Sequence, residues 1–355
     1  MKLLFGVQGT GNGHISRANA ISQELAKYDD ISVDWILSGR PPNELFQVRG
    51  KQSFKRGLTF VTRKGEVRYL DTIRSNNVLT FARDVFTLEL DHYDCLVSDY
   101  EPILSWAAKL RRKPVIGIGH QYAFNHQIPM QGENRFNGAL LRHFAPVDIG
   151  LGLHWHHFDQ PVLPPICDVP DGVLDHRSEK VLVYLPFEDQ QEVLNQLRPI
   201  SDHEFFVYGP DLSDADLGHV HTRALSLEGF KKDLVSSGAV VTNAGFELIS
   251  ECLFLGIRVL AKPLKKQVEQ LSNGAALSQL CYATVVDSIT TAICKDWLRN
   301  SEAVMVTYPR VHEKLARWFA QGRTQTVQSL SEELWARVEV RRGALFKSKW
   351  PDSSS

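Results

Sequence analysis

Short apolar runs alternate with amphipathic segments at the start of the chain. Residues 3–7 are a nearly continuous apolar run, and a second run covers residues 31–37. Between them, Ile15, Ala18 and Leu25 recur at a spacing that places apolar side chains on one helix face. Continuous apolar runs are typical of buried parallel strands, so the pattern predicts a strand, a helix and a second strand, the repeating unit of parallel sheets.

The same alternation continues along the chain and begins again after a proline-rich stretch. Further strands are predicted at residues 94–99, 114–119, 147–153, 181–185, 204–208, 239–242, 257–261 and 283–286. The chain is therefore predicted to be an α/β protein. Its 355 residues suit two domains at ~100–200 residues each.

The proline-rich stretch divides the chain into segments. We expect an N-terminal domain, a linker, a C-terminal domain and a final helix with a frayed tail, at residues 1–163, 164–177, 178–325 and 326–355. The last helix is predicted from apolar positions that include Leu334, Val338 and Leu345.

Composition narrows the functional classes. Hydrophobic residues make up 43% and charged residues 23% of the chain, with a net charge of −1, so no basic field indicates nucleic acid. The five cysteines form no Cys-x-x-Cys pair, which fits a reducing cytoplasm. No run reaches the ~18 apolar residues of a spanning helix, so any membrane contact is expected to be peripheral, on the inner face.

Residues 49–68 differ from their surroundings, because they carry seven basic residues against the single acid Glu66. We interpret this segment as a solvated hairpin or loop insertion. The alternative is a patch for an anionic acceptor or an anionic membrane surface.

Two glycine-containing turns each follow an apolar run and open an amphipathic segment. They cover residues 9–18 and 242–251. Glycine allows close approach of a ligand to backbone N–H groups, and a helix N-terminus adds partial positive charge, so both turns favour phosphate. For the first turn alone, a purely structural role is equally plausible. An NADP-binding site also stays open there, because Ser38 and Arg40 could meet a 2′-phosphate.

The second turn carries a more specific pattern. Gly-Phe-x-x-x-Ser-Glu at 245–251 is followed by Leu-Gly-x-x-Val-Leu at 255–260 and by Gln267-x-x-Gln-x-x-Asn273. This order resembles the donor-binding signature of GT-B glycosyltransferases, in the MurG-like branch related to glycosyl transferase family 1. In that branch the first turn reads Gly-x-Gly-His-x-x-Arg/Pro-Ala, and here residues 11–18 read Gly-Asn-Gly-His-Ile-Ser-Arg-Ala.

The resemblance implies two Rossmann-like domains that face each other across a cleft, with the last helix crossing back to the first domain. It also implies a nucleotide-sugar donor, expected to be UDP-linked, on the C-terminal domain. The donor-binding residues that we predict are Gly209, Asn243, Gly245, Phe246, Ser250, Glu251, Gln267 and Gln270. An acceptor sugar, lipid-linked glycan or other hydroxyl compound is expected on the N-terminal domain.

The catalytic residues are predicted from side-chain chemistry. His14 is proposed as the base that takes a proton from the acceptor hydroxyl, because imidazole titrates near neutrality. Asp99 is the second candidate, either as base or as the partner that orients a histidine. The acceptor side and phosphate loop are predicted to include Gly11, Asn12, Gly13, Arg17, Glu101, His120 and Gln121.

The sequence predicts neither a metal nor another cofactor, because no Asp-x-Asp pair stands at a strand end. The leading function is an inverting glycosyltransferase, where inversion is implied by the resemblance alone. A sugar-nucleotide epimerase on the same scaffold, a sugar-nucleotide-binding regulator and an NADP-dependent enzyme remain alternatives.

Overall fold

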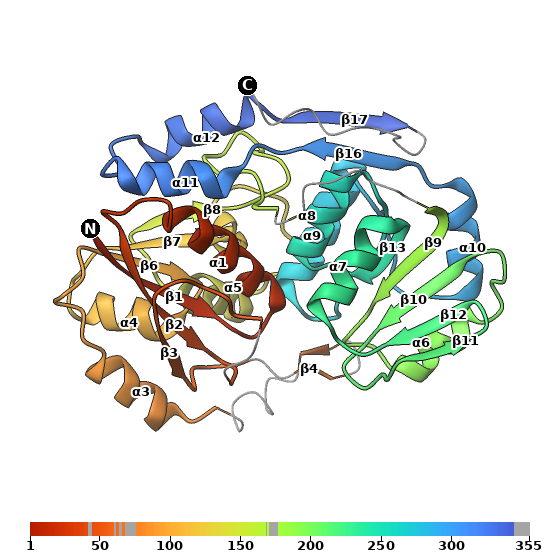
Figure 1. The fold of residues 1–355 in the computed structure, drawn as a ribbon, viewed down its shortest axis with the longest axis horizontal. Coiled ribbons are helices and arrows are strands. Elements are labelled where there is room, and N and C mark those ends of the chain that lie inside the picture. Colours follow the sequence, from red (N-terminus) through yellow and green to blue (C-terminus); the bar gives the residue numbers. More distant parts are fainter. Residues whose placement is uncertain are drawn as a thin grey trace.

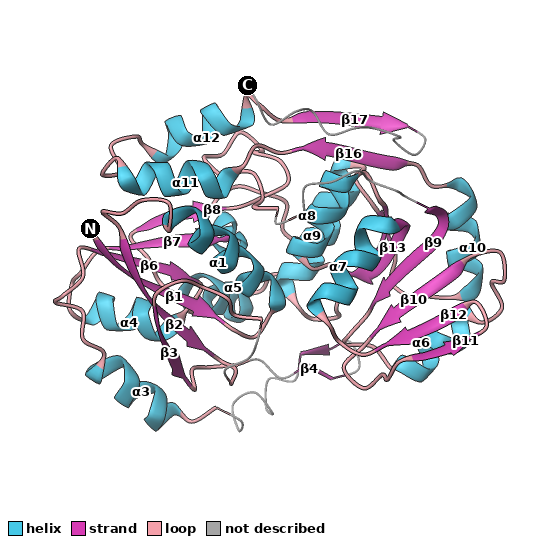
Figure 2. Ribbon diagram, viewed as in Figure 1, coloured by secondary structure: helices cyan, strands magenta, loops and turns pink. Residues whose placement is uncertain are grey.

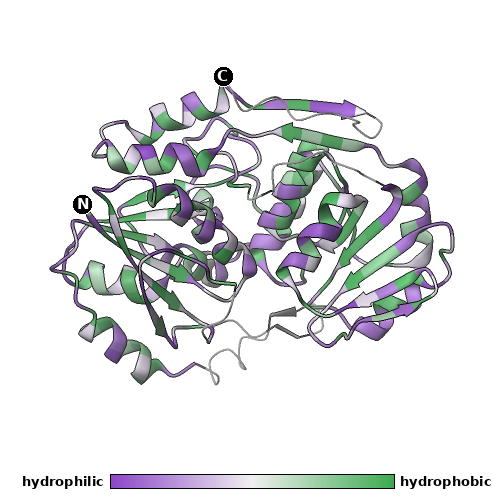
Figure 3. Ribbon diagram, viewed as in Figure 1, coloured by the Kyte–Doolittle hydropathy of each residue, from purple (hydrophilic) through white to green (hydrophobic). Residues whose placement is uncertain are grey.

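The computed structural model describes residues 1–41, 45–59, 62–63, 66–67, 76–167, 169 and 177–343. Two parallel sheets lie side by side with helices packed around them (Figures 1 and 2). Figure 3 shows that the strands are mainly hydrophobic, whereas many helices carry a hydrophilic face. This distribution is the one that the alternating sequence pattern predicts, because a helix buries only one side against its sheet.

The N-terminal sheet is parallel throughout, in the order β3-β2-β1-β6-β7-β8. Its strands are β1 (Lys2–Gln8), β2 (Ser32–Ser38), β3 (Lys51–Lys55), β6 (Cys95–Asp99), β7 (Val115–Gly119) and β8 (Ile149–Gly152). The helices of this half are α1 (Asn12–Leu25), α3 (Val78–Thr87), α4 (Pro102–Leu110), the 3-10 helix η1 (His120–Asn125) and α5 (Arg135–His143). The strand order reverses at β1, which lies between β2 and β6.

The C-terminal sheet repeats this plan in the order β11-β12-β10-β9-β13-β14-β15, with only β11 antiparallel to its neighbour. Its strands are β9 (Arg177–Tyr184), β10 (Glu204–Tyr208), β11 (Ala215–Leu217), β12 (Val220–Arg223), β13 (Ser237–Asn243), β14 (Arg258–Lys262) and β15 (Thr284–Val285). Its helices are α6 (Gln190–Leu197), α7 (Leu227–Ser236), α8 (Phe246–Leu255), α9 (Val268–Leu280) and α10 (Thr291–Asn300). The order reverses at β9, between β10 and β13.

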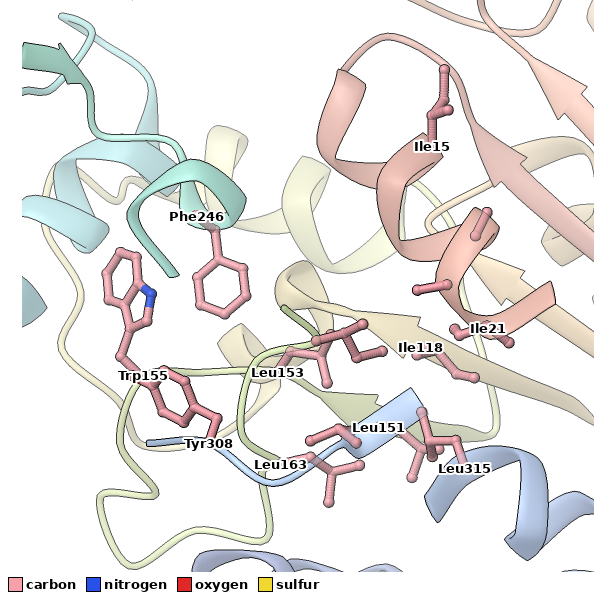
Figure 4. Packing of buried hydrophobic residues seen from close by; sticks show 14 of the residues in the cluster. Ile15, Ile21, Ile118, Leu151, Leu153, Trp155, Leu163, Phe246, Tyr308 and Leu315 are labelled. Carbon is pink, nitrogen blue, oxygen red and sulfur yellow. The ribbon is translucent and has the colours of Figure 1, made fainter. Parts of the chain in front are cut away.

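One hydrophobic cluster joins the two halves. Leu151 and Leu153 of the first half lie in the same buried cluster as Phe246 of α8 and Leu315 (Figure 4). Trp155 lies beside Phe246, with ring centroids 5.0 Å apart. Because the apolar core is continuous, the two domains bury a shared face as well as their own sheets.

The chain crosses back to the first domain earlier than residue 326. β16 (Ala303–Thr307) runs beside α8 and leads to α11 (Val311–Ala320), which packs on α1, and to α12 (Val327–Trp335). The predicted continuation of the last helix through Val338 is wrong, because β17 (Glu339–Gly343) returns and pairs antiparallel with β16. Leu345 and the tail lie outside the described residues.

The basic segment also differs from its interpretation as a hairpin or loop insertion. Its first part is β3, the edge strand of the main sheet, in parallel register with β2. A short hairpin follows, made of β4 (Thr62–Arg63) and β5 (Glu66–Val67). Most of the predicted linker, 168 and 170–176, lies outside the described residues.

Within the described part of the chain, the helices are too short or too polar for any of them to cross a membrane.

Candidate active site

The two glycine turns lie at corresponding places in the two sheets. The first turn joins β1, where the strand order of its sheet reverses, to α1. The second turn joins β13, which lies next to the reversal at β9, to α8. In open α/β sheets, ligands bind outside the carboxyl ends of the strands at these reversal points. Residues on the two turns meet at the domain interface, which makes this interface the candidate active site.

His14, Arg17 and Asp99 form a compact cluster on the first wall. His14 and Arg17 share one face of α1, and Asp99 is the last residue of β6. His14 Nδ1 lies 2.8 Å from Asp99 Oδ1. Arg17 donates to both Asp99 oxygens, from Nε at 2.8 Å and from Nη2 at 2.7 Å. The carboxylate therefore holds both a histidine and a guanidinium, and Nε2 is the His14 nitrogen turned away from it.

Electrostatics favour the charged forms of this cluster. Burial opposes a charge on His14, but the charge and hydrogen bond of Asp99 outweigh it and raise the pKa of His14. Burial likewise opposes ionisation of Asp99, yet Arg17 and His14 hold the pKa of Asp99 below its usual range. An anionic carboxylate beside a histidine stabilises the imidazolium that forms when the histidine accepts a proton.

Arg17 also connects the two domains. Its Nη1 donates to Glu247 Oε1, in the first turn of α8. Burial alone would raise the pKa of the Glu247 carboxyl. The positive charge of Arg17, together with smaller contributions from other neighbours, outweighs burial and lowers the pKa. A Cβ atom at Gly13 would lie only 2.4 Å from Glu247 Cδ. A side chain at position 13 would therefore displace the Glu247 carboxylate of the other domain.

The second turn leaves open space at its helix N-terminus. Gly245 is the N-cap of α8, and no heavy atom lies within 4 Å of the place where its Cβ would be. No side chain caps the helix at this position. Asn243, at the end of β13, donates to Glu188 and to Lys262 O, while its Oδ1 is buried without a hydrogen-bond partner. An open helix N-terminus of this kind suits a phosphate group.

The other predicted donor residues are engaged by protein groups. Glu251 Oε1 accepts from Lys231 Nζ of α7 at 2.5 Å. Gln267 caps α9 by accepting from Gln270 N at 3.3 Å, and Gln270 Oε1 accepts from Leu264 N at 3.0 Å. Gly209 follows β10, where a Cβ would lie 2.5 Å from Gln190 Oε1.

Phe246 and Ser250 occupy the domain interface. The Phe246 ring stacks on His120 with centroids 3.9 Å apart and planes 4° apart, and it is 2% exposed. Ser250 Oγ accepts from Trp155 Nε1 at 2.8 Å and donates to Phe246 O at 2.7 Å. These contacts favour a packing role for both residues over the predicted contact with the donor.

His120 is held between the domains. Its Nδ1 lies 2.8 Å from Leu153 O, and its Nε2 lies 2.7 Å from Asn273 Oδ1 of α9. Asn273 Nδ2 donates to Ala244 O at 2.9 Å, which fixes the orientation of the amide. His120 is fully buried, so this arrangement favours a role in domain contact.

Glu101 and Gln121 differ in what they contact. Glu101 is the buried N-cap of α4 and accepts from Ile103 N at 2.9 Å, from Leu104 N at 2.7 Å and from Ser38 Oγ at 2.6 Å. These contacts favour a structural role over the predicted one in acceptor binding. Gln121 Nε2 donates to Glu269 of the other domain at 3.2 Å.

One group of three side chains in the described residues could bring metal ligands together. Glu24 of α1 lies near His312 and Glu313 of α11, with ligand atoms within 4.8 Å of one another. Lys27 Nζ already contacts both Glu24 carboxylate oxygens, at 2.8 and 2.7 Å. We therefore assign no metal to this group, which lies away from the two turns.

Sequence reasoning missed three residues of the candidate site: Glu247 and Asn273 at the domain interface, and Lys231, which holds Glu251. Glu247 lies inside the second turn and Asn273 ends the Gln-x-x-Gln-x-x-Asn pattern, so both stood in recognised segments. Their partners, Arg17 and His120, come from the other domain, and no spacing within one segment indicates that pairing.

Two Rossmann-like α/β domains that meet at the carboxyl ends of their sheets define the GT-B fold class. The sequence profile of glycosyl transferase family 1 matches residues 1–147 and 161–301, so the chain belongs to that family and is a glycosyltransferase. No curated protein matches the chain.

Solved structures share this fold at low identity. The glycotransferase of kitacinnamycin is 14% identical with a TM-score of 0.58, and the alignment covers 94% of this chain and 97% of that one. SsfS6 from Streptomyces sp. SF2575, complexed with thymidine diphosphate, is 15% identical with a TM-score of 0.54 over 95% and 99% of the two chains. Arabidopsis thaliana UGT89C1, complexed with UDP, is 14% identical with a TM-score of 0.52 over 94% and 98%.

Proposed function

We propose that this protein transfers a sugar from a nucleoside-diphosphate sugar to an acceptor hydroxyl by a single displacement, which inverts the anomeric carbon. The observation that carries the proposal is the His14–Asp99 contact of 2.8 Å at the interface with the open α8 N-terminus. A base on one wall and a phosphate-binding terminus on the other are the two parts that such a transfer needs.

In this reaction His14 Nε2 takes the proton of the acceptor hydroxyl as the hydroxyl oxygen attacks the anomeric carbon. The bond from that carbon to the diphosphate oxygen breaks, and its electron pair leaves with the diphosphate. Asp99 faces His14 Nδ1 and stabilises the imidazolium that forms. Arg17 keeps Asp99 ionised and oriented through two hydrogen bonds.

On the donor side, the backbone N–H groups at the start of α8 would receive the charge that develops on the leaving diphosphate. Glu251 is the candidate for the ribose hydroxyls, with Lys231 holding its carboxylate. The amide oxygen of Gln270 accepts a hydrogen bond from Leu264 N, which leaves the NH₂ group of Gln270 for the sugar or diphosphate. The neighbours complexed with thymidine diphosphate and UDP favour a pyrimidine nucleotide, and we propose UDP.

A panel of diphosphates tests the donor assignment. Thermal shift and calorimetry with UDP, TDP, GDP and ADP should give one clear binder, with NADPH as the comparison. At a hundredfold excess over Kd, binding stabilises the folded state by about 2.7 kcal/mol. Stabilisation by NADPH and by none of the diphosphates would overturn the proposal.

The epimerase alternative predicts a different product. An epimerase converts its sugar nucleotide in the absence of any acceptor, whereas a transferase needs the acceptor hydroxyl. Incubation of UDP-sugars with the protein alone, followed by separation of the epimers, distinguishes the two. A new epimer formed without acceptor would favour the epimerase.

A further inference from the structure

We propose that the cavity beyond the ends of β2 and β3 binds an anionic group of the acceptor, with phosphate as the chemical class. The inference rests on the proposed transfer function, because it assigns part of the acceptor. The cavity measures about 430 Å³ and is distinct from the His14 cluster.

The backbone builds this cavity. Gly39 follows β2 with φ +85°, and Gly57 follows β3 with φ +59°. Gly39 N donates to Arg56 O at 3.0 Å, and a Cβ at Gly57 would lie 2.8 Å from Gly39 N. The two loops are therefore packed backbone against backbone, which only glycine permits at these dihedrals and distances. On the far side, Asn76 bonds both the N–H and the carbonyl of Thr59, each at 2.8 Å.

The lining is positively charged. Arg40, Lys55 and Arg56 all line the cavity, and none of its described lining residues is acidic. Asp84 of the neighbouring helix α3 has its Oδ1 3.4 Å from Lys55 Nζ, a long contact. Thr59 and Asn76 supply polar groups, and Phe54 supplies an aromatic wall. Guanidinium and ammonium groups gathered in one hollow are the donors that phosphate recognition uses.

Arg40 links the cavity to the candidate active site. Its Nη1 donates to Asn12 Oδ1 at 2.9 Å, and Asn12 begins the helix that carries His14. The cavity therefore lies beside the start of α1, where an acceptor that extends from His14 would reach it.

The shape favours a small anion over a membrane surface. Arg40 and Lys55 are half-buried within a hollow, which a flat headgroup layer cannot enter. The neighbouring helix α3 does expose Val78, Leu79 and Phe86, so a lipid surface is the alternative that the experiment must separate.

Calorimetry with inorganic pyrophosphate tests the inference. The protein is first saturated with UDP, so that the donor site is filled. The wild type is compared with the triple variant Arg40→Gln, Lys55→Gln and Arg56→Gln, and with the single variant Arg56→Gln, because Arg56 is the exposed residue of the three. Lys51→Gln is the matched control, because Lys51 is an exposed lysine of the same strand that does not line the cavity.

We expect pyrophosphate to bind the wild type and Lys51→Gln equally, to bind more weakly as salt rises, and to lose at least about tenfold in affinity in the triple variant. Arg56→Gln should show part of that loss, and UDP affinity should not change. Equal pyrophosphate binding by all variants, or no binding at all, would overturn the inference.

Two further arms separate the sources of failure. In the first, binding of the wild type and the triple variant to vesicles of phosphatidylglycerol and of phosphatidylcholine is compared. If pyrophosphate does not bind and the triple variant loses only its binding to vesicles, the cavity binds lipid and the inference is wrong. If none of the nucleoside diphosphates binds, the proposed function fails by itself, and pyrophosphate titrated alone still shows whether the three basic residues hold an anion.

Discussion

Because Gly13 lies against Glu247, the effect of Gly13→Ala on the free energy of unfolding should reverse in sign when Glu247 is removed. Gly13 is the second residue of α1, and a Cβ there would lie 2.4 Å from Glu247 Cδ. In Gly13→Ala, Glu247 must move away, and its hydrogen bond with Arg17 is lost. In a Glu247→Ala background there is no carboxylate to displace, so the same substitution meets no obstacle.

The magnitudes follow from two opposing effects. A hydrogen bond to a charged group contributes roughly 1.5–3 kcal/mol. Alanine instead of glycine within a helix gains roughly 0.5–1 kcal/mol. Gly13→Ala should therefore cost about 1–2 kcal/mol in the wild type and should stabilise the Glu247→Ala protein by up to about 1 kcal/mol.

Urea unfolding of the four proteins of this cycle measures both values. Gly11→Ala is the control, because a Cβ at Gly11 lies 3.6 Å from His14 Cδ2, an ordinary contact, and nowhere near Glu247. Its effect should be the same in both backgrounds. An equal cost of Gly13→Ala with and without Glu247 would refute the argument that the domains touch at this point.

Three other substitutions separate chemical roles from structural ones. Asp99→Asn removes the charge that raises the pKa of His14 and leaves burial, which lowers it. The decline of the transfer rate at acid pH should therefore shift to lower pH, and the maximal rate should fall by ~10²–10⁴. If the acid decline stays at the same pH, Asp99 is not the partner of His14. Ser250→Ala leaves the buried Trp155 Nε1 without its acceptor and should cost about 1–3 kcal/mol in urea unfolding with unchanged diphosphate affinity, whereas weaker diphosphate binding at unchanged stability would restore Ser250 to the donor site. Glu101→Ala removes the cap of α4 and should lower stability by at least ~1 kcal/mol while the acceptor KM stays the same; a raised KM in a stable variant would show acceptor contact.

Apolar periodicity predicted the main strands and several helices because burial determines both. The run at residues 3–7 lies within β1, and the strand predicted at 204–208 is β10 with the same bounds. β3 did not fit the pattern, because Phe54 is its only large apolar residue and an edge strand needs no continuous apolar run. β17 was predicted as helix, because Val338 continues the apolar spacing of α12.

The candidate site was predictable only within each domain. His14 follows the strand predicted at 3–7 and Asp99 ends the one predicted at 94–99, and the structure brings the two side chains together. The contacts Arg17–Glu247 and His120–Asn273 depend on how the domains are placed, which local spacing does not encode. For the same reason the stacking of Phe246, predicted to contact the donor, on His120 was not foreseen.

Transfer by His14→Ala, measured together with its diphosphate affinity, tests the central claim most directly. The His14 imidazole is expected to serve as the base while α8 holds the diphosphate from the other wall. The substitution should therefore lower the transfer rate by ~10²–10⁴ and leave the UDP Kd within about twofold. Transfer at the full wild-type rate would contradict the assignment of His14, whatever the affinity for UDP.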